Sequence, residues 1–152
     1  MREFETINDY AAQVGKEIGV SDWVLVDQDR INKFADATGD HQWIHVDVER
    51  AKKEMPGGKT IGHGYLTLSL VPMLTHGISH VKKVSRGINY GSNKVRFTSP
   101  VPAGSRVRAR QKLIAADPVQ GNGIRFTAEI TIEIEGQERP ACIAEVMSIQ
   151  YA

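Results

Sequence analysis

The sequence predicts an α+β domain in which an antiparallel sheet packs on one apolar helix. The first observation is a segment starting near His63 that carries apolar side chains on every side of a helix. The second is Ile124–Glu135, where every other residue is apolar, as in a strand with one buried face. The third is a set of turn-forming segments that join the last strand candidates into an antiparallel meander: Asp117-Pro118, Gly121–Gly123 and Glu135–Gln137.

The segments before the central stretch predict two helices and a strand. Thr6–Lys16 is expected to be a short amphipathic helix, because its apolar residues recur at helical spacing. Asp22–Gln28 is a strand candidate around the apolar run WVLV. Asp27 or Asp29 can cap the next helix, and Gly39 is expected to end it, because glycine tolerates the left-handed conformation of helix ends.

The end of that helix decides whether two candidate catalytic side chains can meet. Asp40 and His45 are five residues apart. On a regular helix five residues turn about 500°, which leaves the two side chains roughly 140° apart. They converge only if the helix stops first. We therefore expect DHQWIH to form a loop or distorted turn, anchored by burial of Trp43 and Ile44.

Two further helices are predicted after this stretch. Asp47–Glu54 is a short helix capped by Asp47 and broken before a Met-Pro-Gly-Gly sequence. The helix that starts near His63 is apolar on all sides, which indicates burial. Pro72 must kink or end it, because proline lacks a backbone donor. Its apolar residues are Tyr65, Leu66, Leu68, Leu70, Val71, Met73 and Leu74.

The remainder of the chain predicts strands at Gly87–Thr98, Arg106–Ala115, Ile124–Glu135 and Arg139–Tyr151. The second of these carries a basic stripe, which is also typical of nucleic-acid surfaces. Because the next strand carries glutamates, we interpret the stripe as a solvent-exposed face paired across the strands. The stripe consists of Arg106, Arg108, Arg110 and Lys112.

Composition excludes several classes of protein. The 152 residues suit one domain, 1–152, and the formal net charge of +1 gives no reason to expect a nucleic-acid or membrane partner. A single cysteine, Cys142, forbids an intrachain disulfide and suits a reducing compartment; we expect it to pack in a strand. The N-terminus lacks the apolar run of a secretory signal, and no segment is apolar for the length of a membrane span, so we expect a cytoplasmic protein.

The central stretch resembles a known family. FADATGDHQWIH (Phe34–His45) is similar to the signature of MaoC-like dehydratases and (R)-specific enoyl-CoA hydratases, in which an aromatic residue, Ser/Thr-Gly-Asp and a later His recur. His63-Gly64 before an apolar helix is a second match, and VRFTSPV (Val95–Val101) followed by Gly104 is a third. Gln42-Trp43 replaces the Asn-Pro of many members, a change that the subgroup similar to nodulation protein N tolerates.

The resemblance implies the hot-dog fold and a hydro-lyase that interconverts trans-2-enoyl-CoA and (R)-3-hydroxyacyl-CoA. It implies no cofactor beyond the coenzyme A of the substrate, with acyl carrier protein as the alternative carrier. It also implies a homodimer formed through edge strands, with the sites near the interface. The same resemblance makes Asp40 and His45 the catalytic pair and the backbone N–H of Gly64 the oxyanion donor.

The chemistry of these groups supports that assignment independently. Hydration needs a base to activate water, an acid to protonate the α-carbon and donors for the developing oxyanion. Asp40 and His45 can share one water between them, and the sequence leaves open which is the acid. The unpaired N–H groups of a helix start can hold the oxyanion, and Gly64 lets a substrate approach them. Substrate-binding candidates are Trp43, His63, Tyr65, Lys94 and Arg96, the last two for carrier phosphates.

Each assignment has a structural alternative. Asp40 also has the pattern of a turn cap, and a single histidine such as His45 is often structural. We expect His63 to be a hydrogen-bonded residue at a helix start and His41 to be exposed. The histidines lack a ligand pattern such as HExxH, so no metal is expected.

Two other functions remain open at this stage. A thioesterase on the same fold would direct water at the thioester carbon and release a free thiol. A non-catalytic acyl-thioester-binding module would bind without turnover. The Asp-plus-His spacing favours hydration over both.

Overall fold

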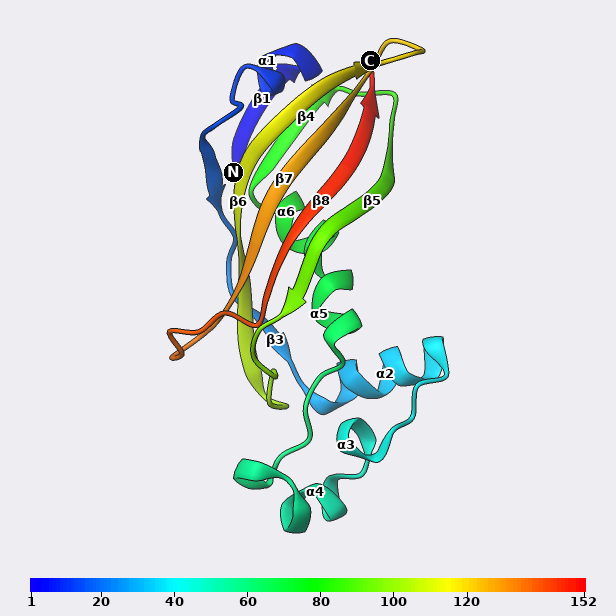
Figure 1. Cartoon of the computed structure of the whole chain (residues 1–152), viewed down its shortest axis with the longest axis vertical. Coiled ribbons are helices and arrows are strands. Elements are labelled where there is room, and N and C mark those ends of the chain that lie inside the picture. The colour runs from blue at the N-terminus through cyan, green and yellow to red at the C-terminus, as the bar shows by residue number, and fades with distance from the viewer.

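A computed structural model describes all 152 residues, and its main feature is a curved six-stranded sheet (Figure 1). Strands β6 (Ser105–Val119), β7 (Gly123–Ile134) and β8 (Cys142–Tyr151) form its antiparallel centre. Strand β5 (Arg86–Phe97) pairs with β8 at one edge, and β2 (Glu17–Val20) and β3 (Val24–Val26) pair with β6 at the other. The predicted meander is confirmed.

Alternation along β7 explains which face of the sheet packs inward. Its even-numbered residues from Ile124 to Ile134 are all buried, whereas Glu129 is exposed. The basic stripe on β6 lies on the outer face, as expected. Arg108 and Arg110 both pair with Glu133 at 2.8 Å, and Arg106 pairs with Glu135.

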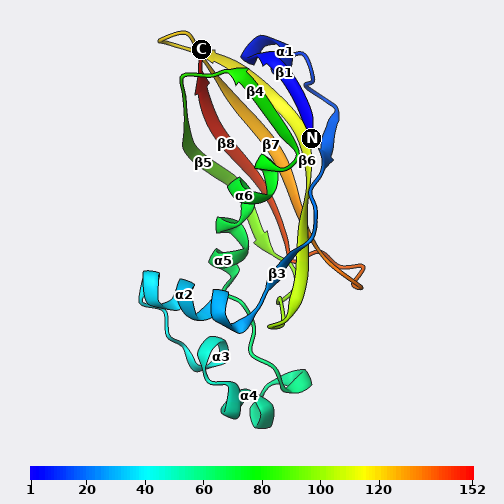
Figure 2. The same cartoon turned by 180° about the vertical axis from the view of Figure 1, so that it is seen from behind.

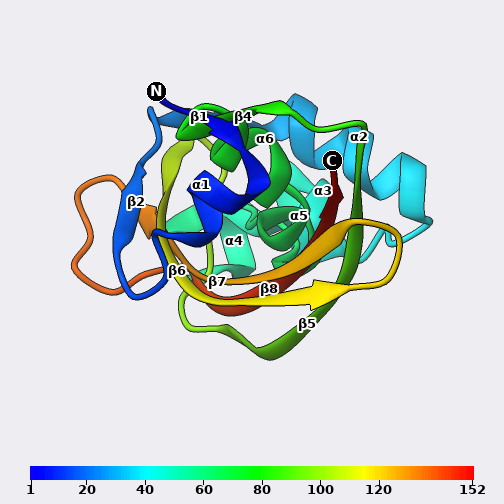
Figure 3. The same ribbon diagram turned by 90° about the horizontal axis from the view of Figure 1, so that it is seen from above.

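The apolar helix lies inside the curve of the sheet, but it is two short helices (Figure 3). Helix α5 (Gly64–Ser69) ends before Leu70, and α6 (Val71–His76) starts with Pro72 in its first turn. The break agrees with the effect predicted for this proline. The expectation of burial on every side was wrong, because Tyr65 is 70% and Met73 is 44% exposed. Only one face of the helices packs on the sheet, which leaves these two side chains uncovered by the chain.

The N-terminal segment departs from its prediction. Thr6 caps a helix, α1, that covers only Ile7–Ala11, and Asp9 completes a reciprocal capping box. The strand β1 (Arg2–Thr6) precedes it and pairs in parallel with β4 (Ser79–Lys83) in a second, two-stranded sheet. Neither strand was predicted, because each is short and half polar and its partner is distant in the sequence.

Helices α2 (Gln28–Thr38), α3 (Trp43–Val46) and α4 (Val48–Glu54) gather at one end of the molecule, with a short 3₁₀ turn η1 (Pro56–Gly58) (Figures 1 and 2). Asp27 caps α2 and Asp47 caps α4, as predicted. The DHQWIH segment is a turn followed by the single turn of α3. None of the helices is both long and apolar enough to cross a bilayer.

Candidate active site

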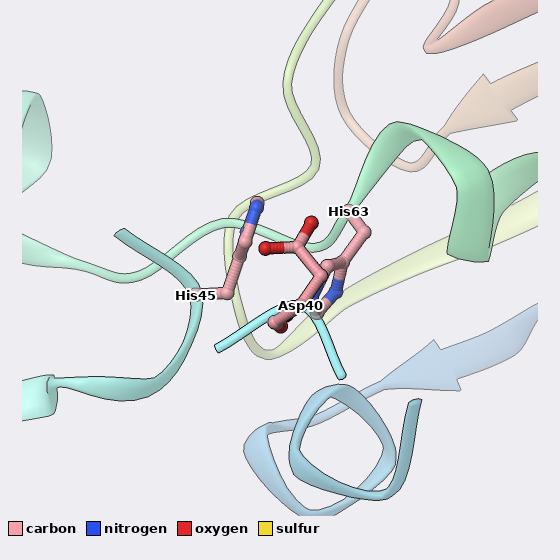
Figure 4. Close-up of side chains that lie close together, drawn as sticks. All are labelled: Asp40, His45 and His63. Carbon is pink, nitrogen blue, oxygen red and sulfur yellow. The ribbon is translucent and has the colours of Figure 1, made fainter. Parts of the chain in front are cut away.

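Asp40, His45 and His63 meet at the start of the central helix (Figure 4). They come from three places in the chain: the turn after α2, the helix α3 and the residue that caps α5. One ionisable atom of each lies within 4.8 Å of the others. Both predicted catalytic side chains are therefore in one cluster, together with a histidine that the sequence analysis treated as a binding residue.

Gly39 creates this convergence. It ends α2 in the left-handed conformation, with φ 81°, while its N–H donates to the carbonyl of Ala35. Asp40 then begins the turn, and its carboxylate accepts a 3.3 Å hydrogen bond from the backbone N–H of Gln42. That bond is the turn-capping role proposed as the alternative for Asp40. The capping bond uses one carboxylate oxygen, so the other can still act in catalysis.

The environment of His45 fixes which ring nitrogen is free. His45 is 7% exposed, and its Nδ1 lies 2.7 Å from the carbonyl oxygen of Ile61. Because a carbonyl only accepts, Nδ1 carries the proton in the neutral ring and Nε2 presents a lone pair. Gln28 adds a second restraint, since its side-chain amide donates to the backbone carbonyl of His45 at 2.7 Å. Sequence reasoning missed Gln28, because its contact spans two elements.

His63 contacts the backbone of Asp40. Its Nε2 lies 2.9 Å from the backbone carbonyl oxygen of Asp40 and so donates to it. The ring is 2% exposed and stacks on His45 with centroids 3.8 Å apart, and Phe34 packs against it at 4.9 Å. His63 thus ties the Asp40 turn to the start of α5, in agreement with its expected role as a hydrogen-bonded residue at a helix start.

Gly64 is the first residue of α5, and its backbone N–H has no hydrogen-bond acceptor in the chain. A Cβ atom at this position would lie 2.8 Å from the ring of Phe97. Glycine is therefore required here by the packing of Phe97, a reason that the sequence did not reveal. The N–H remains available to an acceptor from outside the chain.

The other predicted binding residues lie around the cluster rather than in it. Trp43 is half-buried, and its indole face is covered by the guanidinium of Arg50 at 4.0 Å. Tyr65 is largely exposed and packs edge-on against Phe97. Lys94 and Arg96 are exposed on β5, and Lys94 lies 3.6 Å from Glu145. Their roles in binding stay predictions.

His41 follows Asp40 in the sequence but is not part of the cluster. His41 is exposed, as expected, and it pairs with Asp36 at 2.9 Å, which raises the pKa of its imidazole. The three clustered side chains are of types that bind metals, but Nδ1 of His45 and Nε2 of His63 each already contact a backbone carbonyl oxygen. This arrangement favours the metal-free site, which remains a prediction.

A sheet wrapped around a short central helix, with a carboxylate and an imidazole at the helix start, defines a hot-dog domain with an acid–base site. The profile of the MaoC like domain matches residues 9–133. The chain therefore belongs to the MaoC-like dehydratase family.

Relatives and solved structures agree with this membership. The chain is 52% identical over 145 residues to 3-hydroxyacyl-thioester dehydratase Z of Mycobacterium tuberculosis, covering 95% of each chain. It is 45% identical over 145 residues to nodulation protein N of Rhizobium leguminosarum, covering 95% of this chain and 90% of the relative. The (R)-hydratase of A. caviae superposes with a TM-score of 0.67 at 21% identity, covering 91% of this chain and 96% of that chain. This likeness confirms the hot-dog fold.

Proposed function

We propose that this protein reversibly hydrates trans-2-enoyl thioesters to (R)-3-hydroxyacyl thioesters, as one catalytic domain spanning residues 1–152. The observation that carries the proposal is the cluster in which a carboxylate oxygen of Asp40 and a ring nitrogen of His45 lie within 4.8 Å of each other at the start of α5. The relative that is 52% identical to this chain, a 3-hydroxyacyl-thioester dehydratase, supports it.

The proposed mechanism uses one water molecule between Asp40 and His45. The water oxygen bonds to the β-carbon, and one water proton passes to the base. The electrons of the double bond move toward the thioester oxygen, where the N–H of Gly64 stabilises the charge. A proton then reaches the α-carbon from the acid, so nothing but water is consumed. Either Asp40 or His45 can be the base in this scheme, and no cofactor is needed.

The carrier of the acyl group is proposed to be coenzyme A, with acyl carrier protein as the alternative. Lys94 and Arg96 are exposed cations on β5, the strand that brings Phe97 against Gly64. Their position on this strand suits contacts with carrier phosphates outside the cluster. We place the protein in the cytoplasm, where such thioesters are made and used.

We also propose a homodimer formed through β5. This strand is the edge of the sheet, and eleven of its twelve residues are exposed. Three of the exposed side chains are large and apolar: Ile88 at 47%, Tyr90 at 55% and Phe97 at 46%. A long exposed edge strand with apolar side chains is a template for pairing with another strand, and a second copy of β5 can supply that strand. Pairing there would place the partner beside Gly64 and the exposed Tyr65.

A two-channel assay tests the proposed activity against its rivals. The purified protein is mixed with short and medium trans-2-enoyl-CoAs, and loss of the conjugated-thioester absorbance is followed beside a thiol reagent. Hydration predicts loss of absorbance without free thiol. Release of free thiol would instead establish a thioesterase. Binding of the thioester with neither loss of absorbance nor release of thiol would establish a binding module.

A further inference from the structure

A cavity of about 1020 Å³ lies between the central helices and the inner face of the sheet. Tyr10 of α1 and Ser79 of β4 are among its lining residues, and these two elements lie at the end of the molecule away from α2–α4 (Figure 2). Leu68 and Val71 line it from the helix side, and Phe126 and Ile130 line it from β7. Leu68 is one turn after Gly64, a rise of about 6 Å along the helix. An acyl chain whose thioester oxygen sits at Gly64 therefore has space ahead of it that is lined partly by apolar side chains.

Gln111 is a polar residue that lines this cavity at a position of β6 where the strand pattern predicts an apolar side chain. Gln111 is 7% exposed and lies on the inner face of β6 between Ala109 and Leu113, both fully buried. Its Nε2 donates to the hydroxyl of Tyr10 at 3.0 Å. Its Oε1 is buried and has no hydrogen-bond partner. An unpaired buried acceptor is costly, so its presence calls for a donor from outside the chain.

No neighbouring group of the chain donates a hydrogen bond to Oε1 of Gln111. Burial raises the pKa of Tyr10 to about 12, so its hydroxyl stays protonated, and the hydroxyl oxygen already accepts the bond from Gln111 Nε2. Exchanging the positions of the oxygen and nitrogen of the Gln111 amide still leaves one polar group unpaired, because the N–H₂ group would then lack a partner. Tyr10, Ser79 and Gln111 all line the cavity, so the missing donor can arrive through it.

We propose that this cavity accepts an acyl chain bearing a hydroxyl group toward its distal end, and that Gln111 Oε1 receives the hydrogen bond from that hydroxyl. The inference rests on the proposed hydratase function and adds a substrate class to it. A hydroxyl supplies the donor that Oε1 lacks, whereas a methyl group supplies none and a carboxylate would oppose an acceptor with an acceptor. Helix α6, which packs against β6, lies about 10–18 Å along the helix axis from Gly64, so a chain of medium length is implied.

The test compares pairs of trans-2-enoyl-CoAs that differ only at the chain end, one with a terminal hydroxyl and one with a methyl, across a ladder of chain lengths. At one medium length the native protein should prefer the hydroxyl member by at least about tenfold in kcat/KM. Gln111→Leu should abolish or reverse this preference while leaving turnover of the shortest enoyl-CoA unchanged. Gln111→Met is a second variant of similar volume, in case the leucine variant folds poorly.

Gln150→Leu provides the matched control. Gln150 also lines the cavity with a buried, unpaired Oε1, but it sits on β8 opposite Ile124, whereas Gln111 sits on β6 opposite Ile130. It should keep the hydroxyl preference. The inference is overturned if the native protein prefers the methyl member at every length, or if only Gln150→Leu loses the preference. Absence of hydration even with the shortest enoyl-CoA would overturn the proposed function itself, and this inference with it.

Discussion

At the scale of single residues, two backbone carbonyls set the chemistry of the site. The carbonyl of Ile61 holds the proton of His45 on Nδ1, and the carbonyl of Asp40 holds that of His63 on Nε2. The first bond leaves Nε2 of His45 for the chemistry, and the second holds the backbone of Asp40 in place. The pair Asp40 and His45 was predictable from the sequence, because Gly39 indicates that the helix ends before Asp40. The bond from His63 to the Asp40 carbonyl was not, since no local pattern encodes it.

The first prediction concerns His63. His63→Leu removes the donor that holds the Asp40 carbonyl, so kcat should fall about tenfold or more with KM nearly unchanged. His63→Gln places an amide N–H near the position of Nε2 and should recover much of the loss. Steady-state kinetics of the two variants decide the matter, and an equal loss in both with a matching fall in the free energy of unfolding would show a purely structural role.

The second prediction concerns Cys142. The side chain is 1% exposed, and burial raises the pKa of its thiol to about 11. The native protein should therefore not react with a disulfide reagent near pH 8 and should react with one equivalent after unfolding. An unreactive Cys142 also means that the protein's own thiol does not add to the thiol signal in the assay for thioesterase activity. Rapid labelling of the native protein would contradict the packing described for β8.

At the scale of elements, the predictions succeeded where a local signal sufficed. Strand β7 alternates cleanly, Asp27 and Asp47 cap their helices, and Pro72 breaks the central one. The predictions failed where an element forms only by pairing with a segment that is distant in the sequence. Strands β1 and β4 exist because each pairs with the other across about half of the chain, and neither has the pattern of a strand by itself. Burial of the central helix was overestimated for the same reason, since it depends on what covers each face.

The third prediction concerns the end of α2. Gly39→Ala forces a residue with a Cβ to φ 81°, which costs about 1–2 kcal/mol and disturbs the turn that delivers Asp40. Gly136→Ala is the matched control, because Gly136 has φ 80° in the turn after β7, and neither glycine has a neighbour that its Cβ would touch. Both variants should lose similar stability in urea unfolding. Only Gly39→Ala should also lose activity, and parallel loss in both would refute the link to Asp40.

At the scale of the whole molecule, one surface of the chain carries an exposed edge strand, an exposed aromatic side chain and an exposed candidate catalytic residue. The outer edge strand β5, the exposed Tyr65 and the exposed Asp40 are all left open by a single chain. The composition of the chain, with its net charge of +1, could not reveal this surface, because exposure of apolar residues is a property of the assembled sheet. The resemblance to the family, rather than any residue pattern, is what predicted a dimer.

The fourth prediction tests that dimer. Tyr90→Lys places a charge on the exposed edge of β5, where it should oppose pairing of two copies. Light scattering should give a dimer for the native protein and a shift toward monomer for the variant. Lys112→Ala, a change on the exposed outer face of β6, should leave the dimer intact. A native protein that is monomeric at all concentrations would contradict the proposal.

The most direct test of the central claim is the effect of Asp40→Asn and His45→Gln on kcat/KM for hydration of a short trans-2-enoyl-CoA. We predict losses of about 10²–10⁴-fold for each, because each variant removes a group that moves a proton. His41→Gln, one residue from Asp40 but exposed and bonded to Asp36, should retain full activity. Hydration at native rates in either Asp40→Asn or His45→Gln would contradict the account of this cluster as the catalytic site.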